Sequence, residues 1–124
     1  MPSLILVMLG GAIGAGARHL VGAAFLARLG PGFPWGTLAV NLVGGLAMGL
    51  LAGWLSRAGG TDQARLFLGV GILGGFTTFS AFSLETWLLI ERGQPGPAAA
   101  YVLASVVGSL ALLLAGLFAT RAAA

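Results

Sequence analysis

Residues 74–83 read Gly74-Gly75-Phe76-Thr77-Thr78-Phe79-Ser80-Ala81-Phe82-Ser83. Two glycines that weaken a helix and a cluster of hydroxyl side chains thus interrupt a segment that is otherwise apolar enough for a membrane. Backbone polar groups freed inside hydrocarbon are costly, so non-helical chain at that depth must be buried in protein or line an aqueous site. Interrupted transmembrane helices commonly direct helix ends and unpaired carbonyls toward ions. The stretch predicts a helix break at Gly74-Gly75 that serves an ion.

The composition predicts an integral membrane protein. Of the 124 residues, 58% are hydrophobic and 7% are charged, whereas about 25% of a soluble domain is charged. The six arginines are spread singly along the chain, which argues against a nucleic-acid partner because that requires a clustered basic face. With no Cys and one His, a metal site of the usual His/Cys kind is excluded. No nucleophile, base and orienting group occur together, so we do not expect an enzyme.

Charged residues and Gly/Pro clusters divide the chain into four apolar segments, 4–27, 34–56, 65–90 and 97–120. Each is close to the roughly 20 residues that span a bilayer. The expected fold is all-α: one membrane domain, 1–124, of four transmembrane helices, with the third helix broken near its middle. We expect it in the cell membrane (plasma or inner membrane) as a multi-pass protein in contact with membrane lipid.

The arginines near the ends of these segments give only a weak orientation signal. Three lie on the face that carries both termini and two on the other: Arg57, Arg65 and Arg121 against Arg28 and Arg92. A three-to-two ratio is a small bias for the positive-inside rule. Such a chain can insert both ways and form an antiparallel homodimer, or take one orientation set by a factor outside the sequence.

The second segment has one strongly polar residue, Asn41, with Thr37 one helical turn before it on the same face. A buried Asn in a membrane must find partners. The commoner role is an interhelical hydrogen bond, and the alternative is a donor to a polar path. The glycines at 45, 49 and 53 form a small-residue ridge, which we interpret as a helix contact.

The fourth segment places Tyr101, Ser105 and Ser109 on one helix face. Each hydroxyl can donate a hydrogen bond. The alternative is that the serines bond to carbonyls of their own helix and that the tyrosine sits at the membrane interface. This segment alone does not separate the two interpretations.

Phe79 and Phe82 lie on one face directly after the expected break. Aromatic residues at that spacing usually belong to a core or face lipid. Their position among Thr and Ser residues favours a second role, because the positive edge of a phenyl ring can face an anion without holding it too tightly.

Two charged side chains fall in the interior of the apolar segments, away from their ends. Arg18 either extends its guanidinium to the nearer interface or draws anions into a vestibule. Glu85 either pairs with Arg18 or ends a polar path. Both are candidate vestibule residues.

Taken together, the chain resembles the Fluc (CrcB) family of fluoride channels along nearly its whole length. The resemblance rests on three separated motifs: Gly10-Gly11-Ala12-Ile13-Gly14-Ala15-Gly16-Ala17-Arg18, Gly36-Thr37-Leu38-Ala39-Val40-Asn41, and Gly74 to Glu85, of which the last is the most specific. It implies an antiparallel homodimer with dual topology, two fluoride pores along the subunit interface, and a structural sodium ion (Na+) where the two broken helices cross.

The resemblance also implies residue roles. Phe79 and Phe82 would turn ring edges toward fluoride, and Asn41, with Thr37 one turn before it, would supply pore donors. The fourth-helix polar track would be Tyr101, Ser105 and Ser109. The carbonyls of Gly74 and Thr77 would bind sodium, and Arg18 and Glu85 would lie at the pore ends.

A pore for fluoride must replace the ion's hydration with donors and still release it, which amide and hydroxyl groups allow. The main alternative is a small dual-topology multidrug or cation exporter. Such a protein needs a membrane carboxylate to exchange protons for substrate, and Glu85 is its only candidate here. A structural subunit of a larger membrane complex would account for the glycine ridges but not for the polar break.

Overall fold

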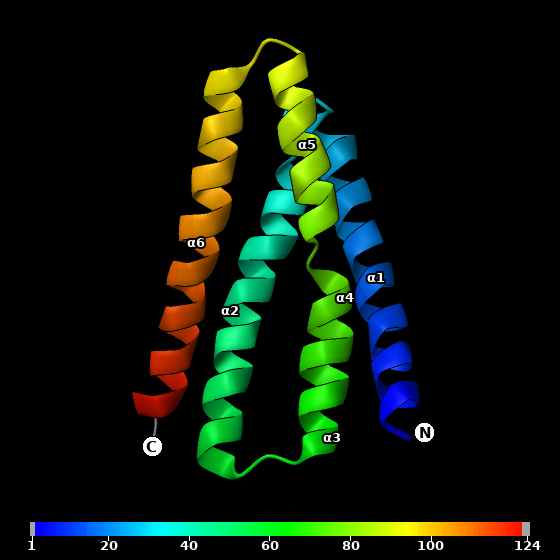
Figure 1. Ribbon diagram of the computed structural model, residues 1–124, viewed down its shortest axis with the longest axis vertical. Helices are drawn as coiled ribbons and strands as arrows, with labels where there is room; N and C mark the ends of the chain where they lie inside the picture. The colour runs from blue at the N-terminus through cyan, green and yellow to red at the C-terminus, as the bar shows by residue number, and fades with distance from the viewer. Residues whose placement is uncertain (1, 123–124) are drawn as a thin grey trace.

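The computed structural model describes residues 2–122, which are helical apart from short connections (Figure 1). The elements in chain order are α1 (Pro2–Leu29), α2 (Trp35–Ala58), α3 (Asp62–Ala64), the π-helix η1 (Arg65–Leu73), α4 (Gly74–Phe76), α5 (Phe79–Glu91) and α6 (Pro95–Ala122). Four helical stretches, counting Asp62–Glu91 as one, are long and apolar enough to cross a membrane. The prediction of an all-α chain with four long apolar helices is confirmed.

Both described ends of the chain lie at one end of the molecule, together with the connection between α2 and α3 (Figure 1). The connections α1–α2 and α5–α6 lie at the other end. Gly30 and Gly59 terminate α1 and α2 with positive φ values of 75° and 62°, a conformation that costs glycine little. The chain therefore reverses direction within a few residues at each end.

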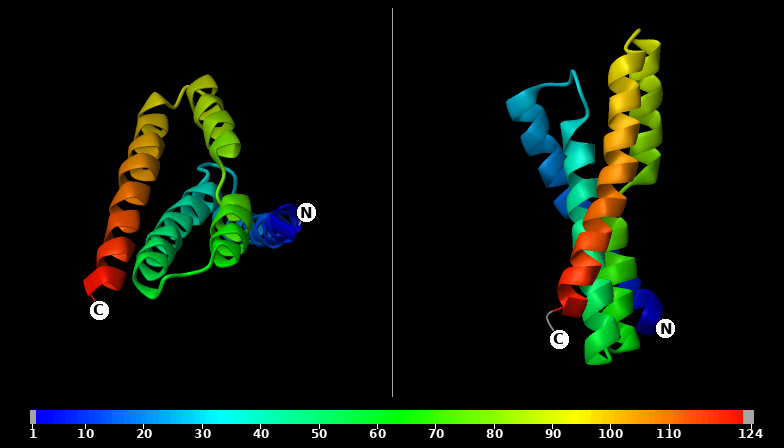
Figure 2. Two further views of the ribbon diagram at one scale, coloured as in Figure 1. Left: turned by 60° about the horizontal axis from the view of Figure 1, so that its bottom comes forward. Right: turned by 90° about the vertical axis from the view of Figure 1, so that its left-hand side faces the viewer.

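Helix α6 packs along α2, and its first turns lie beside α5 (Figure 2). Glycines of α2 face backbone of α6 along this interface. A Cβ atom on Gly45 would lie 2.8 Å from the Ser109 carbonyl oxygen, Gly49 faces the Leu113 backbone in the same way, and Gly53 faces the Thr120 side chain. The interpretation of this ridge as a helix contact is confirmed.

The predicted position of the break is wrong by three residues. Gly74 and Gly75 are helical in α4, and the extended residues are Thr77 and Thr78. Gly75 instead permits close packing, because a Cβ atom there would lie 2.6 Å from the carbonyl oxygen of Gly11 in α1. Thr77 and Thr78 therefore separate α4 from α5, and Figure 1 shows the non-helical connection between the two helices.

We expect Gly49→Ala to lower the thermal unfolding midpoint, because the added methyl group meets the Leu113 backbone of α6. Overpacking of this kind costs about 1–3 kcal/mol. The matched control is Gly16→Ala in α1, where an added Cβ has no atom within 4 Å and helix propensity improves. Equal midpoints for the two variants would contradict the assigned α2–α6 contact.

Candidate functional site

Thr77 and Thr78 form the break between α4 and α5. Their φ/ψ angles of −82°/159° and −150°/125° are extended. The Thr78 hydroxyl accepts a hydrogen bond from the Ala81 N–H at 3.2 Å and so caps the N-terminus of α5. The Thr77 hydroxyl donates to the Leu73 carbonyl at 3.0 Å. The two hydroxyls thus tie the break to the helices on either side.

The Asn41 amide in α2 holds the backbone of Thr78 from the other side. Its Nδ2 donates to the Thr78 carbonyl at 3.1 Å, and its Oδ1 accepts from the Thr78 N–H at 2.9 Å. The Thr78 N–H therefore does not serve Gly74, four residues earlier, as it would in a continuous helix. An amide group has two N–H donors, so one Asn41 N–H is left for another acceptor.

A cavity of about 480 Å³, which we call the break cavity, lies beside this pairing. Residues of α2, the break, α5 and α6 line it: Asn41, Gly44, Gly45, Met48, Thr77, Thr78, Phe79, Phe82, Ser105, Val106, Ser109, Leu110 and Leu113. None of these described lining residues is charged. The cavity combines apolar walls with neutral amide and hydroxyl groups.

The hydroxyls of Tyr101, Ser105 and Ser109 in α6 do not bond to their own helix. Ser109 Oγ donates to the Asn41 carbonyl at 3.3 Å. The buried hydroxyls of Tyr101 and Ser105 have no hydrogen-bond partner among residues 2–122. Buried donors without partners are rare in proteins and are available to an acceptor. The alternative of bonding to carbonyls of the same helix is therefore wrong for both serines.

Phe79 and Phe82 both line the break cavity, with ring centroids 5.6 Å apart and planes tilted by 46°. Their environments differ, because Phe82 is buried whereas Phe79 is 78% exposed. Phe82 also lies 5.2 Å from the Tyr101 ring, which meets Phe33 edge-on at 5.5 Å. One ring is thus fixed within the subunit and the other projects from it.

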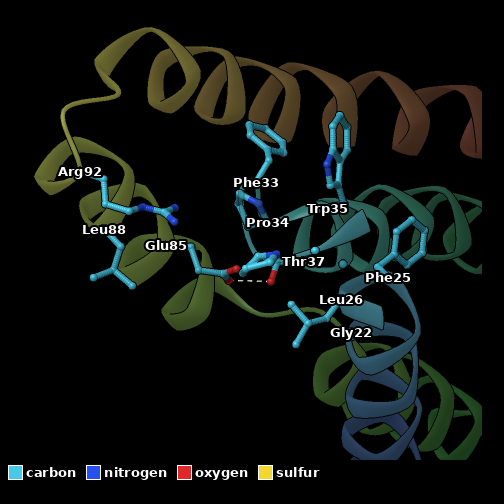
Figure 3. Close-up of a pocket in the computed structure, with 13 residues that line it drawn as sticks. Gly22, Phe25, Leu26, Phe33, Pro34, Trp35, Thr37, Glu85, Leu88 and Arg92 are labelled. Atoms are coloured by element: carbon cyan, nitrogen blue, oxygen red, sulfur yellow. Dashed lines mark hydrogen bonds between the residues drawn. The ribbon is translucent and has the colours of Figure 1, made fainter. Parts of the chain in front are cut away.

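Thr37 and Glu85 lie in a second cavity of about 390 Å³, shown in Figure 3, which we call the outer cavity. Thr37 Oγ1 donates to Glu85 Oε1 at 2.6 Å. Arg92 also lines this cavity, together with aromatic residues of α1, α2 and their connection: Phe25, Phe33 and Trp35. Although Thr37 and Asn41 share a helix face, they line different cavities.

Arg18 does not pair with Glu85 in the part of the chain that the structure describes. Its Nε donates to the Gly75 carbonyl at 3.1 Å instead. The pairing considered from the sequence is thus replaced by two separate contacts, one at α4 and one at α2. Arg18 lines neither cavity.

The carbonyls of Gly74 and Thr77 are the predicted sodium ligands. Outside the helical ladders of residues 2–122, neither accepts a hydrogen bond. No group of three or more His, Cys, Asp or Glu side chains suited to a metal occurs in this part of the chain. As oxygen donors, these two carbonyls are of the ligand type that a hard cation prefers.

The sequence did not indicate three participants in these cavities. The backbone of Thr78 carries the Asn41 pairing, Gly44 makes room for the Thr77 methyl group, and Arg92 lines the outer cavity. Nothing in the sequence distinguished Gly44 from the other glycines of the membrane segments. The isolated polar Asn41 near a break was a usable signal for a backbone partner, because a buried amide must bond somewhere.

Comparison with known proteins assigns the chain to a family. A family described as CrcB-like protein, Camphor Resistance (CrcB), matches residues 5–117. The chain belongs to this family. A protein of Sphingopyxis alaskensis is 66% identical over 122 residues, which cover 98% of this chain and 97% of that protein. A protein of Mesorhizobium japonicum is 53% identical over 121 residues, covering 98% of each. Both relatives are named fluoride-specific ion channel FluC.

Proposed function

We propose that this protein is a fluoride-specific ion channel of the cell membrane, which lets fluoride leave the cell passively. The observation that carries the proposal is the break cavity, where an amide, several hydroxyls and two phenyl rings meet with no charged side chain among the described lining residues. Relatives that are named fluoride-specific channels and match nearly the full length support the same function. The protein is not an enzyme.

The donor set suits fluoride on physical grounds. Fluoride is small and strongly hydrated, so entering the pore requires several hydrogen-bond donors in place of water. The free Asn41 N–H and the Ser105 hydroxyl supply such donors, and the ring edges of Phe79 and Phe82 add weak positive charge. Because the lining lacks a fixed cation, binding stays weak enough for release. Glu85, the carboxylate that an exporter would need, lies in the outer cavity instead.

We further propose that two copies form an antiparallel homodimer. Phe79 lines the break cavity yet is 78% exposed in the single subunit, so its outer face is available to a second copy. Within the described subunit, helix α5 packs against α6 and α2. Large apolar side chains elsewhere, such as Leu20 and Leu103, are exposed and would face membrane lipid.

A structural sodium ion is proposed for the carbonyls of Gly74 and Thr77. In the dimer, the two breaks would approach each other, and an ion shared between them would give these carbonyls a partner. Carbonyls within the membrane need such a partner. The ion would neutralise the carbonyl ends of two helices and join the subunits, with no part in transport itself.

Fluoride should leave loaded liposomes that contain the purified protein, down its own gradient and without an imposed proton or sodium gradient. A fluoride electrode measures this efflux. Phe82→Ile and Asn41→Leu should reduce it at least about tenfold, because they remove the ring edge and the amide donor, each about 1.4 kcal/mol or more at the barrier. Phe82→Ile should remain a folded oligomer by size-exclusion chromatography, whereas Asn41→Leu also removes both hydrogen bonds to the Thr78 backbone and should be less stable.

The control for these variants is Leu112→Ile, a volume-conserving change in α6 expected to cost less than about 1.5 kcal/mol in stability. Parent efflux in Phe82→Ile and Asn41→Leu would move the pore away from the break cavity. Efflux that required an imposed cation gradient would instead indicate coupled transport.

Dual topology predicts labelling from both sides of the membrane. Because the chain has no cysteine, Ala122→Cys at the end of α6 provides a single reactive site. A membrane-impermeant maleimide should label about half of the copies in intact vesicles, and the remainder after permeabilisation. Complete labelling before permeabilisation, or none, would show one orientation.

The sodium proposal predicts bound metal after purification. Protein that is purified in sodium and then washed free of it should retain about one sodium ion per dimer, because exchange through a buried site is slow. Elemental analysis measures the retained sodium. Gly74→Pro, which changes the local backbone, should release it. Full loss of sodium from the parent during washing, without dissociation of the dimer, would contradict a structural ion.

A further inference from the structure

The guanidinium of Arg18 lies within the span of α1, yet it has no carboxylate partner in residues 2–122, where Arg65–Asp62 is the ion pair. An intramembrane charge that is not paired in this way needs another acceptor. Its Nε donates to the Gly75 carbonyl, 57 residues away, at 3.1 Å in a partly buried position. This contact joins α1 to the helix that ends at the break.

The backbone of α1 approaches those of η1 and α4 closely enough to fix this contact. A Cβ atom on Gly75 would lie 2.6 Å from the Gly11 carbonyl oxygen, and one on Gly10 would lie 2.9 Å from the Gly71 Cα. Arg18 follows Gly11 by two helical turns on the same face. The glycine contacts therefore set the distance that lets the Arg18 side chain reach Gly75.

The Gly75 carbonyl lies at the C-terminal end of the helical run 62–76, next to the break. A helix C-terminus carries partial negative charge, and a cation there is stabilising. Asn41 holds Thr78 three residues further on through two hydrogen bonds. The break is thus held on one side by α1 and on the other by α2.

We propose that Arg18 is a positioning residue for the pore: its Nε hydrogen bond to the Gly75 carbonyl fixes the end of α4 and so the orientation of the Thr77 and Thr78 backbone. Arg18 acts through Gly75 and does not itself contact the permeating ion. This role deepens the proposed channel function and differs from attraction of anions by the Arg18 charge, which needs no contact with Gly75.

Three substitutions separate the hydrogen bond from the charge. In Arg18→Gln, the amide nitrogen stands as many bonds from Cα as the Arg Nε, so the donor is kept and the charge is lost. Arg18→Met is equally uncharged and has a methyl group at that position. Arg18→Lys keeps the charge but has a methylene there. The control for charge loss in the same helix is Arg28→Gln, at the exposed end of α1.

The test is amide hydrogen exchange of Thr77 and Thr78 in detergent or lipid nanodiscs without fluoride, referenced to amides of α6 in the same sample. Arg18→Gln and Arg28→Gln should match the parent protein. Arg18→Met and Arg18→Lys should exchange at least about tenfold faster at these two amides, because a hydrogen bond from a charged or amide donor is lost. In liposomes, the same two variants should lose fluoride over chloride selectivity, which Arg18→Gln keeps.

Equal exchange in Arg18→Gln and Arg18→Met, at any level, would overturn the proposal, because these neutral variants differ in the donor. Protection in Arg18→Lys with loss in Arg18→Gln would overturn it in favour of a charge effect. If Arg18→Lys gives no folded oligomer, the comparison of Gln with Met decides alone. Since the exchange experiment contains no fluoride, it stands whether or not the efflux experiment supports a channel.

Discussion

The hydrogen bonds around Thr77 and Thr78 are the constraint on which the remaining structure depends. Inside hydrocarbon, each backbone group released by the break must find a partner in the protein, in water or in a bound ion. The Thr78 N–H and carbonyl find the Asn41 amide, and the Gly75 carbonyl finds Arg18. These partners come from two other helices, so the break is stable only when α1 and α2 lie where they do. The packing of the helices and the geometry of the break cavity therefore depend on the same hydrogen bonds.

Glycine makes these positions attainable. Along the α2–α6 interface and between α1 and the helical run 62–76, backbone meets backbone where any side chain would collide, as at Gly45 and Gly75. Membrane helices lack a hydrophobic drive toward each other, so close backbone contact supplies much of their association. The same contacts bring the amide of Asn41 and the guanidinium of Arg18 within hydrogen-bonding distance of backbone groups at or next to the break.

The four helices could be predicted from the sequence because apolar length alone fixes a membrane span. The position of the break could not be predicted from the sequence. Gly74 and Gly75 indicate a weak helix, but a helix ends where its freed groups find partners, and here the Thr78 hydroxyl and Asn41 provide these three residues later. The sequence also did not predict that Thr37 and Asn41 line different cavities. Helical spacing puts both on one face, whereas the offset of α5 after the break brings Glu85 to Thr37 and the Phe79–Phe82 pair to the cavity of Asn41.

The distribution of charge follows from the same arrangement and bears on permeation. Glu85 and Arg92 lie in the outer cavity and Arg18 is engaged with Gly75, so the described lining of the break cavity holds only neutral groups. A guanidinium or ammonium group there would bind a small anion strongly in a medium of low dielectric constant and slow its release. Neutral donors replace hydration in several weak contacts, which favours passage over retention. Holding Arg18 on the backbone thus gives the break an ordered structure while keeping a strong cation out of the ion's path.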